Sequence, residues 1–264
     1  MSELPPAFFQ RRGELLHPTG LTRGPWSEAL MHGGPPAALL GGAIARAEPA
    51  PEAFLLQRLS VEFLRPLALG PLRVTCEVVR AGRQVQRLQA RLTSAEGAEL
   101  ATASGLRARR GSLALPPAPA RPDALPGPEG VESFVFPFFQ TGSVAYHRGV
   151  EARIVRGAWC QGPLLAWMRT LFPLIEGEPT SPLERLLVLA DAESGVCPPL
   201  DPRQYTFPNP DLTVHLTRDP QGEWFALDAV PCVEPNGLGL VASALHDQAG
   251  FLGRAAQGLI VEPR

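Results

Sequence analysis

The residues that could do chemistry are scattered along the chain and form none of the common catalytic signatures. There is no G-x-S-x-G nucleophile elbow, no phosphate-binding glycine loop, and no cluster of His, Cys, Asp and Glu with metal-ligand spacing. Two isolated features remain. Asp191 follows the apolar run 186–190, and His32, Gly33 and Gly34 precede another apolar run. A carboxylate and the free backbone N–H groups at a helix start favour chemistry without a metal or a covalent nucleophile.

The composition indicates a folded protein that does not bind polyanions. Of the 264 residues, 45% are hydrophobic and 19% charged, and the net charge is −2. A large core is therefore expected, and nucleic acid is not an expected partner. The longest uncharged apolar run, 29–45, is too short and too rich in proline and glycine to span a membrane.

The four cysteines indicate a reducing environment. They form no C-x-x-C pair, and no secretory signal precedes them; they are Cys76, Cys160, Cys197 and Cys232. We therefore expect a cytoplasmic protein with free thiols.

A weak internal repeat divides the chain into two halves. The segment 23–26 (RGPW) recurs as 156–159 (RGAW), and the glycine pair at 97 and 105 recurs at 250 and 258. Between the halves, residues 111–130 are dense in proline and alanine, which favours an extended linker. The repeat predicts two domains, 1–110 and 131–264, joined by that linker.

Each half is predicted to contain one helix and about four strands. The helices are expected at 35–47 and 182–192, and the second has Ser181 as N-cap with Pro182 and Glu184 behind it. Alternating hydrophobicity predicts strands at 54–67, 72–81, 84–94 and 99–109, and at 211–217, 223–233, 239–246 and 250–261. We further expect an added helix at 163–172 and a strand within the aromatic segment 131–148.

The first helix is unusual because residues 36–45 carry no charge. A helix that is apolar on all sides must be buried on all sides. Gly41 and Gly42 each cost about 1 kcal/mol relative to alanine, which is tolerable where another backbone packs closely. A long antiparallel sheet curled around a central helix meets these demands.

A buried helix wrapped by a sheet, occurring twice, resembles the double-hotdog acyl-CoA thioesterases (acyl-CoA thioesterase II-like, thioesterase-like superfamily). The matching stretches occur in order through nearly the whole chain: 32–34, 179–185 leading into 190–191, 209–216 with Arg218, 222–224 with 227–229, and 257–259. The resemblance implies an α+β double hotdog, with two tandem copies of a long antiparallel sheet wrapped around a central helix. It also implies hydrolysis of acyl-CoA thioesters, with no cofactor beyond the CoA of the substrate.

The resemblance also assigns candidate site residues. In that family a carboxylate on the second hotdog helix, a polar residue opening the next strand and a glutamine on the last strand hold the attacking water. These roles fall on Asp191, Asn209 and Gln257. Asn209 departs from the threonine of the best-known branch, although an amide can still hydrogen-bond a water. His32, Gly33 and Gly34 are the candidate substrate-binding residues, with backbone amides as donors to an oxyanion.

The repeat predicts one working site per chain. Aligning the helices places Ile44 opposite Asp191, and aligning the last strands places Ser104 opposite Gln257. The first half therefore lacks the carboxylate and is expected to act as a scaffold or a wall for the substrate. We expect the nucleotide end of CoA to lie near exposed arginines, with three candidates: Arg107, Arg109 and Arg110.

Two other functions stay open. The Asn209 departure is compatible with a hotdog protein that binds acyl-CoA or acyl groups without hydrolysing them. Asn209-Pro210 with His215 resembles the enoyl-CoA hydratase branch, although no aspartate precedes Asn209 at that branch's spacing. A homodimer is expected, because hotdog sheets join edge to edge or face to face. We expect an acyl-CoA as the small-molecule partner, and neither nucleic acid nor a membrane.

Overall fold

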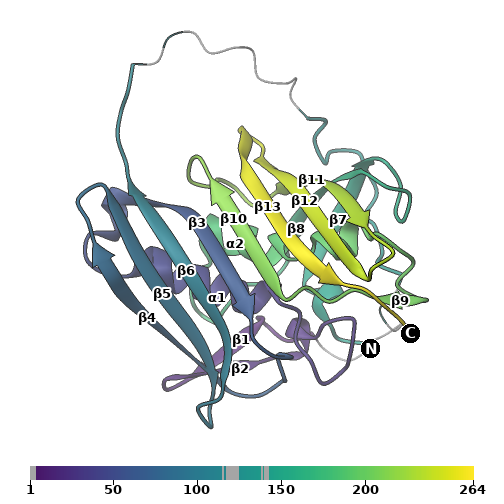
Figure 1. Ribbon diagram of the computed structural model, residues 1–264, viewed down its shortest axis with the longest axis horizontal. Helices are drawn as coiled ribbons and strands as arrows, with labels where there is room; N and C mark the ends of the chain where they lie inside the picture. The colour runs from purple at the N-terminus through teal and green to yellow at the C-terminus, as the bar shows by residue number, and fades with distance from the viewer. Residues whose placement is uncertain (1–3, 115, 117–124, 138, 140–142) are drawn as a thin grey trace.

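One large antiparallel sheet dominates the computed structural model, which describes residues 4–114, 116, 125–137, 139 and 143–264 (Figure 1). Its twelve strands lie in the order β1-β2-β4-β5-β6-β3-β10-β13-β12-β11-β8-β7, and β9 and β14 form a separate pair. None of the described helices is long and apolar enough to cross a membrane.

The first half contributes six strands and one α-helix to this arrangement. They are β1 (Phe9–Arg12), β2 (Leu15–Pro18), α1 (Gly34–Arg46), β3 (Phe54–Phe63), β4 (Leu72–Ala81), β5 (Val85–Ser94) and β6 (Glu99–Arg109). Short 3₁₀ turns occupy Gly20–Thr22 and Pro51–Ala53. The helix and the four long strands were predicted from the alternation and the apolar run, with boundaries within a few residues.

The second half contributes the remaining strands and two α-helices. They are β7 (Val150–Arg156), β8 (Leu164–Thr170), α2 (Pro182–Ala190), α3 (Glu193–Val196), β9 (Tyr205–Thr206), β10 (Asp211–Leu216), β11 (Phe225–Val233), β12 (Leu238–Asp247), β13 (Gly250–Ile260) and β14 (Glu262–Pro263). A 3₁₀ turn at Tyr146–Arg148 precedes β7. The predicted capping box of α2 is present, because the Ser181 hydroxyl accepts from the Glu184 N–H and the Glu184 carboxylate accepts from the Ser181 N–H.

The order of the strands has the same pattern from both ends of the sheet. Reading inward gives β1-β2-β4-β5-β6-β3 from one end and β7-β8-β11-β12-β13-β10 from the other. The halves meet where β3 pairs with β10, and there Ser60 and Thr213 are directly opposite, with their hydroxyl oxygens 3.2 Å apart.

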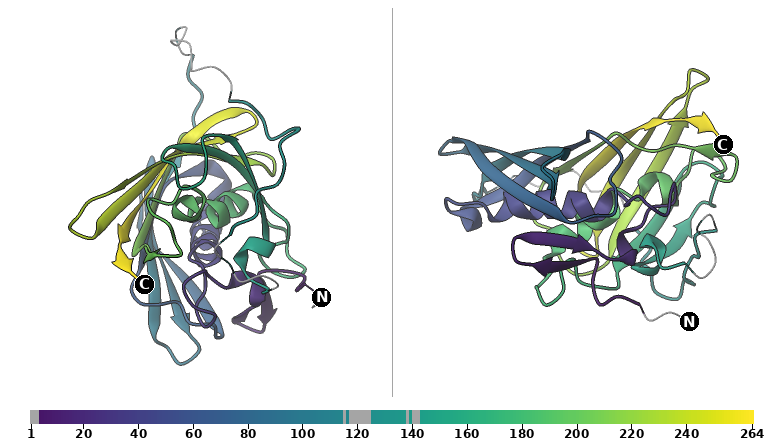
Figure 2. Two further views of the ribbon diagram at one scale, coloured as in Figure 1. Left: turned by 90° about the vertical axis from the view of Figure 1, so that its right-hand side faces the viewer. Right: turned by 90° about the horizontal axis from the view of Figure 1, so that it is seen from below.

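The two longer helices pack against each other on the inner side of the sheet (Figure 2). α1 contacts β3, β4, β5 and β6, whereas α2 contacts β8 and β11. Glycines make the close approach of the two helices possible. A Cβ at Gly34 would overlap the carbonyl of Val188, and a Cβ at Gly41 would overlap the Leu187 side chain. The glycines of α1 are therefore a packing requirement, and the close approach predicted from Gly41 and Gly42 is the contact with α2.

The helix expected at 163–172 is wrong. This segment forms strand β8, which pairs with β7 and β11. Both faces of β8 are buried, because Leu165 and Trp167 on the outer face pack with Leu125, Ala226 and Trp224. A short run buried on both faces has no alternation, and such a run cannot be distinguished from a buried helix by periodicity.

The strand expected within 131–148 is also absent from the described part of that segment, where the Tyr146–Arg148 turn is the regular element. Residues 138 and 140–142 lie outside the described residues, as do 115 and 117–124 of the predicted linker. The hairpin of β1 and β2 was not predicted. Its strands have four residues each, too few to show a pattern.

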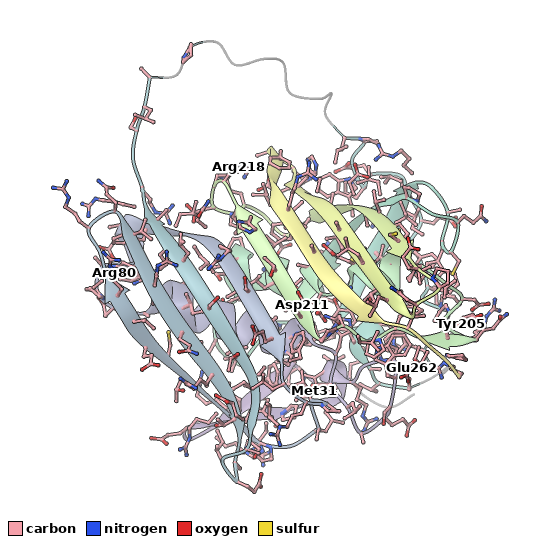
Figure 3. The ribbon with its side chains drawn as sticks, viewed as in Figure 1. Met31, Arg80, Tyr205, Asp211, Arg218 and Glu262 are labelled. Carbon is pink, nitrogen blue, oxygen red and sulfur yellow. The ribbon has the colours of Figure 1, made fainter. Side chains whose placement is uncertain are left out.

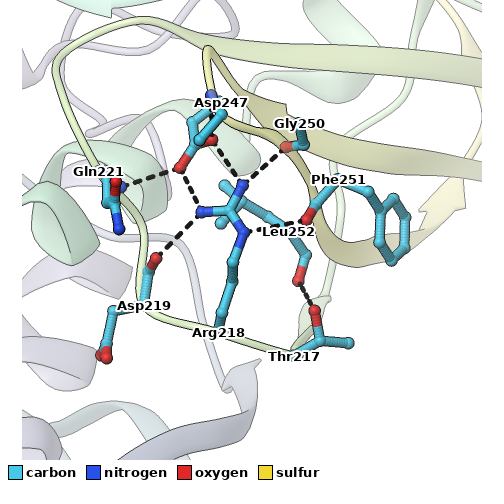
Figure 4. A network of polar contacts seen from close by, with 9 residues as sticks. Thr217, Arg218, Asp219, Gln221, Asp247, Gly250, Phe251 and Leu252 are labelled. Atoms are coloured by element: carbon cyan, nitrogen blue, oxygen red, sulfur yellow. Dashed lines mark hydrogen bonds and ion pairs between the residues drawn. The ribbon is translucent and has the colours of Figure 1, made fainter. Parts of the chain in front are cut away.

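A partly buried ion pair fixes the end of the sheet beside β10 (Figure 4). The Arg218 guanidinium donates to both carboxylate oxygens of Asp247, at 2.7 and 2.6 Å, and to the carbonyl of Gly250 at 2.9 Å. Asp247 also accepts from the backbone N–H groups of Gln221 and Ala249. Arg218, part of the family resemblance, thus joins the β10–β11 connection to the β12–β13 turn.

Candidate functional site

Asp191 lies at the end of α2, where that helix meets the start of α1. It is the C-cap residue of α2, and its side chain is 2% exposed. It nevertheless lines a cavity of about 360 Å³, together with His32, Gly33 and Asn209. Three of the predicted elements, α1, α2 and the segment before β10, therefore meet around one buried carboxylate.

Asn209 is held in one orientation beside this carboxylate. Its Nδ2 donates to Asp191 Oδ1 at 2.8 Å and to the carbonyl of Asp211 at 3.0 Å. Because both N–H groups are used, the amide oxygen is the group that Asn209 can offer to a ligand in the cavity. The result is an acceptor next to a carboxylate, which suits a water molecule that donates to both.

His32 contacts the other carboxylate oxygen. Its Nδ1 lies 3.0 Å from Asp191 Oδ2 and 3.1 Å from the Gly34 nitrogen. A single ring nitrogen either accepts from Gly34 or, when it carries a proton, donates to Asp191. The imidazole stacks on Tyr146, with ring centroids 3.8 Å apart and an interplanar angle of 6°.

Tyr146 is a buried support for this arrangement that sequence reasoning missed. Its hydroxyl donates to the carbonyl of Val188 at 2.9 Å, near the end of α2. Burial, with the nearby Asp191 charge, raises the pKa of Tyr146 well above its usual value, so the hydroxyl stays a donor. The sequence signal for Tyr146 is its position in the aromatic segment 131–148, for which the sequence predicts a strand.

Gly33 lines the cavity at the start of α1, and its N–H is the candidate donor there. Pro35 and Pro36 have no N–H, and the Gly34 N–H lies against His32. No backbone carbonyl among the described residues accepts from the Gly33 N–H. A Cβ at Gly33 would lie 2.7 Å from Asp191 Oδ2, so only glycine lets this backbone approach the carboxylate. The positive end of the α1 dipole adds to the donor's strength.

Gln257 is close to Asp191 but contacts its backbone. It is fully buried on β13 and is not part of the cavity lining. Its amide is satisfied in one orientation, in which the nitrogen donates to the Asp191 carbonyl at 3.3 Å and the oxygen accepts from the Ser194 N–H at 3.0 Å and hydroxyl at 2.9 Å. Gln257 therefore holds the turn between α2 and α3 that positions Asp191.

Glu193 is a second buried carboxyl next to the site, and sequence reasoning missed it. It is fully buried, and neither of its oxygens has a hydrogen-bond partner among the described residues. Burial, with the charge of Asp191, raises its pKa well above the usual value, which favours the neutral acid. An acidic residue two positions after Asp191 gives no sequence signal for such burial.

The cavity itself is mostly apolar. Aromatic side chains from several segments line it: Trp26, Phe63, Phe136, Phe139, Tyr146 and Phe207. Met31, labelled in Figure 3, lies in the same lining. No group of three or more His, Cys, Asp and Glu in the described part of the chain could hold a metal ion. An apolar cavity that ends at a carboxylate, an amide and a backbone N–H suits an acyl group joined to a polar reacting carbonyl.

Two family models match the chain, each over a different segment. Residues 22–108 match the acyl-CoA thioesterase N-terminal domain, and residues 117–261 match the acyl-CoA thioesterase C-terminal domain. The chain belongs to the acyl-CoA thioesterase family. The resemblance proposed from the sequence motifs is confirmed, and the protein is a thioesterase.

Solved structures share the fold of this thioesterase. A hotdog-fold protein from Alicyclobacillus acidocaldarius is 21% identical, with 96% of this chain and 95% of that chain covered and a TM-score of 0.71. A putative thioesterase II from Thermobifida fusca is 20% identical over 97% and 96% of the two chains, with a TM-score of 0.73. An acyl-CoA thioesterase II from Mycobacterium marinum is 15% identical over 97% and 94%, with a TM-score of 0.66. No curated protein matches the sequence.

The arginines expected near CoA do not line the Asp191 cavity. Arg107 is fully buried and donates to the carbonyls of Ala45 and Ala47, at 3.2 and 2.7 Å. Arg110 pairs with Asp219, and the Arg109 guanidinium lies over the Phe54 ring. In a strand with a buried face, every second residue points inward, and the sequence did not show which face Arg107 occupies. In the thioesterase, Arg107 binds the carbonyl groups at the end of α1.

Proposed function

We propose that the protein hydrolyses acyl-CoA thioesters to the free acid and CoA with a water held by Asp191 and Asn209. The observation that carries the proposal is the pairing of Asp191 Oδ1 with Asn209 Nδ2 at 2.8 Å, in the wall of an apolar cavity. The water donates one proton to the Asp191 carboxylate and the other to the Asn209 amide oxygen. Its lone pair then faces a thioester carbonyl in the cavity.

The reaction needs no cofactor or covalent intermediate on the protein. Asp191 takes a proton from the water as its oxygen bonds to the carbonyl carbon. The carbonyl oxygen becomes an oxyanion, for which the Gly33 N–H at the start of α1 is the donor. The intermediate then collapses, the C–S bond breaks, and the CoA sulfur leaves with the electron pair and takes up the proton. Gln257 acts as a positioning residue through the Asp191 backbone.

We also propose that the chain is two hotdog units in tandem, within 1–110 and 131–264, with one working site. The matching strand order of the two ends supports the tandem arrangement. At the end of α1, the position that corresponds to Asp191 at the end of α2, the Arg107 guanidinium donates to the carbonyls of Ala45 and Ala47. The cavity lined by Ala45, near the end of α1, measures about 70 Å³, which is too small for an acyl chain with its thioester.

The alternative functions differ in what they require of the site. A binding protein would keep the apolar cavity without using the Asp191 carboxylate. A hydratase would require His215 in the site, but His215 is exposed on β10 and does not line the cavity. The geometry therefore favours hydrolysis.

Release of free thiol from short, medium, long and aromatic acyl-CoAs tests the proposal. We expect turnover of at least one class, and a fall in kcat of about tenfold or more for Asn209→Ala, which removes one acceptor of the water. Asn209→Thr should keep more activity, because threonine also offers an oxygen. Absence of turnover, with acyl-CoA still raising the melting temperature, would favour the binding protein.

A homodimer and a cytoplasmic location remain part of the proposal. Large apolar side chains are exposed on the outer face of β11 and β12: Val230 at 53%, Leu238 at 53% and Leu240 at 48%. An exposed apolar sheet face supports pairing with a second copy. Light scattering at micromolar concentration checks this, and a monomer would contradict it.

A further inference from the structure

We propose that a second cavity, adjacent to the one lined by Asp191, binds the phosphate groups of the CoA part of the substrate; this inference rests on the proposed function. The cavity has a volume of about 380 Å³. Three arginines line it, Arg23, Arg203 and Arg264. We call it the arginine cavity.

The arginine cavity and the Asp191 cavity share a wall. Gly24, Pro25 and Trp26 belong to the lining of both. The Trp26 ring is fixed between them, because it packs edge-on against Phe207 with centroids 5.0 Å apart. These shared residues make the two cavities direct neighbours, and we place one ligand across both. The apolar cavity suits the acyl end, and the arginine cavity suits an anionic end.

The chain brings the three arginines together from distant segments. The pairing of β9 with β14 places Tyr205 opposite Pro263, and the Arg264 N–H donates to the carbonyl of Gln204 at 2.9 Å. Figure 3 labels Tyr205 and Glu262 of these two strands. Arg203 and Arg264 thus lie at the same edge. Arg23 joins them from the segment before α1, where its carbonyl accepts from the Tyr146 N–H.

The guanidinium groups in this cavity are only partly neutralised. The Arg23 Nε is buried and has no hydrogen-bond partner among the described residues. Arg264 lies over the Trp26 ring at 5.7 Å, a contact that leaves its N–H groups able to bind an anion. Arg203 is paired with Asp201 at 2.7 Å, and the exposed Glu28 also lines the cavity. Of the three arginines, Arg203 is therefore paired with a carboxylate that lies outside the lining, and Glu28 is the carboxylate within it.

Phosphate is the chemistry that matches these groups. Planar guanidinium groups bind phosphate oxygens with two parallel hydrogen bonds, and such charge-assisted bonds are about twice as strong as neutral ones. CoA has phosphates at its nucleotide end, whereas its thioester end is uncharged. The polarity of the two cavities thus orients the substrate, with the acyl group on one side of Trp26 and the nucleotide on the other.

The experiment compares two thioesters of one acyl group, an acyl-CoA and the corresponding acyl-pantetheine, which has no phosphate. Arg203→Gln/Arg264→Gln changes two exposed side chains, so the fold should be kept. We expect the double variant to lower the kcat/KM ratio of acyl-CoA to acyl-pantetheine about tenfold, mainly through the KM for acyl-CoA. An unchanged ratio would overturn the proposal. Added salt should lower the same ratio in the wild type.

A second arginine cluster provides the matched control. Arg80, Arg83 and Arg87 line a cavity of about 390 Å³ that shares no residue with the Asp191 cavity. Arg80 lies far from Met31 in Figure 3. Arg80→Gln/Arg87→Gln removes the same total charge, and we expect the ratio to stay within twofold of the wild type. A fall equal to that of the first double variant would assign the effect to overall charge and overturn the proposal.

Binding of adenosine 3′,5′-bisphosphate, measured by calorimetry, separates this inference from hydrolysis. We expect binding to the wild type, binding weakened about tenfold by Arg203→Gln/Arg264→Gln, and binding strengthened by Asp201→Asn, which frees Arg203. If no thioester is hydrolysed but this binding pattern holds, the proposed function fails and the phosphate site stands. If thioesters are hydrolysed and the bisphosphate does not bind, the phosphate site fails alone.

Discussion

Replacing Gly33 with alanine should disable hydrolysis while the fold is kept. The new Cβ would lie 2.7 Å from Asp191 Oδ2, 3.0 Å from Oδ1 and 2.7 Å from the Phe63 Cζ. Gly33 has φ −67°, which any residue adopts, so the effect comes from the contact and not from backbone strain. The Phe63 ring has a free end that can move, but the carboxylate is held by Asn209 and His32.

The size of the effect follows from the distance. Ordinary contact begins at 3.4 Å, so the carboxylate or the α1 backbone must move by about 0.7 Å. A misplacement of about 1 Å in a reacting group costs about 10²-fold in rate, and we expect kcat to fall by about 30- to 100-fold. Overpacking costs about 1–3 kcal/mol of folding free energy, which is less than the total stability of a typical protein.

The assay is thiol release from the best acyl-CoA, with circular dichroism and thermal unfolding to confirm the fold. Gly70→Ala is the control, because a Cβ at Gly70 has no atom within 4 Å. We expect Gly70→Ala to match the wild type in kcat. If folded Gly33→Ala keeps kcat within threefold of Gly70→Ala, then the close approach of α1 to Asp191 is not needed for catalysis and the reasoning is refuted.

Two further predictions concern buried acids. Burial acts to raise the pKa of Asp247, but Arg218 and backbone N–H donors hold that pKa below its usual value. Asp247→Asn should therefore lower the unfolding free energy by about 3 kcal/mol at pH 7, and this loss should shrink as acid protonates Asp247. Denaturant titration beside the control Asp228→Asn, which changes a surface ion pair, checks this, and equal losses in the two variants would contradict it. Burial raises the pKa of Glu193, which costs stability as pH rises above the carboxyl's unfolded value. Glu193→Gln should therefore raise the melting temperature more at pH 8 than at pH 5, and the reverse order would show that Glu193 is ionised.

The sequence predicted the elements that carry a local pattern. Strands such as β5 alternate between buried and more exposed residues, and α2 begins with a capping box. The alternation and the capping box can each be recognised within a few consecutive residues. The glycines of α1 predicted a close approach, and the structure shows α2 as the neighbour. The pairing of β3 with β10 connects two halves, and no local pattern could have indicated its register.

The site was predicted only in part, because its residues were placed by resemblance to a family. Asp191 and Asn209 meet as expected, whereas Gln257 contacts the backbone of Asp191. Tyr146 and Glu193 are buried by tertiary packing that their neighbours in sequence do not encode. The arginine cavity depends on the pairing of β9 with β14, two strands of two residues each, which are too short to show a pattern.

The most direct test of the central claim is kcat for acyl-CoA hydrolysis by Asp191→Asn, measured by thiol release beside Asp228→Asn. The asparagine keeps the shape of the side chain and removes its ability to take a proton from water. General base catalysis supplies about 10²- to 10⁴-fold in rate, so we predict a fall of at least about 10²-fold for Asp191→Asn. Asp228→Asn should stay close to the wild type. A folded Asp191→Asn variant with kcat within threefold of the wild type would contradict the account.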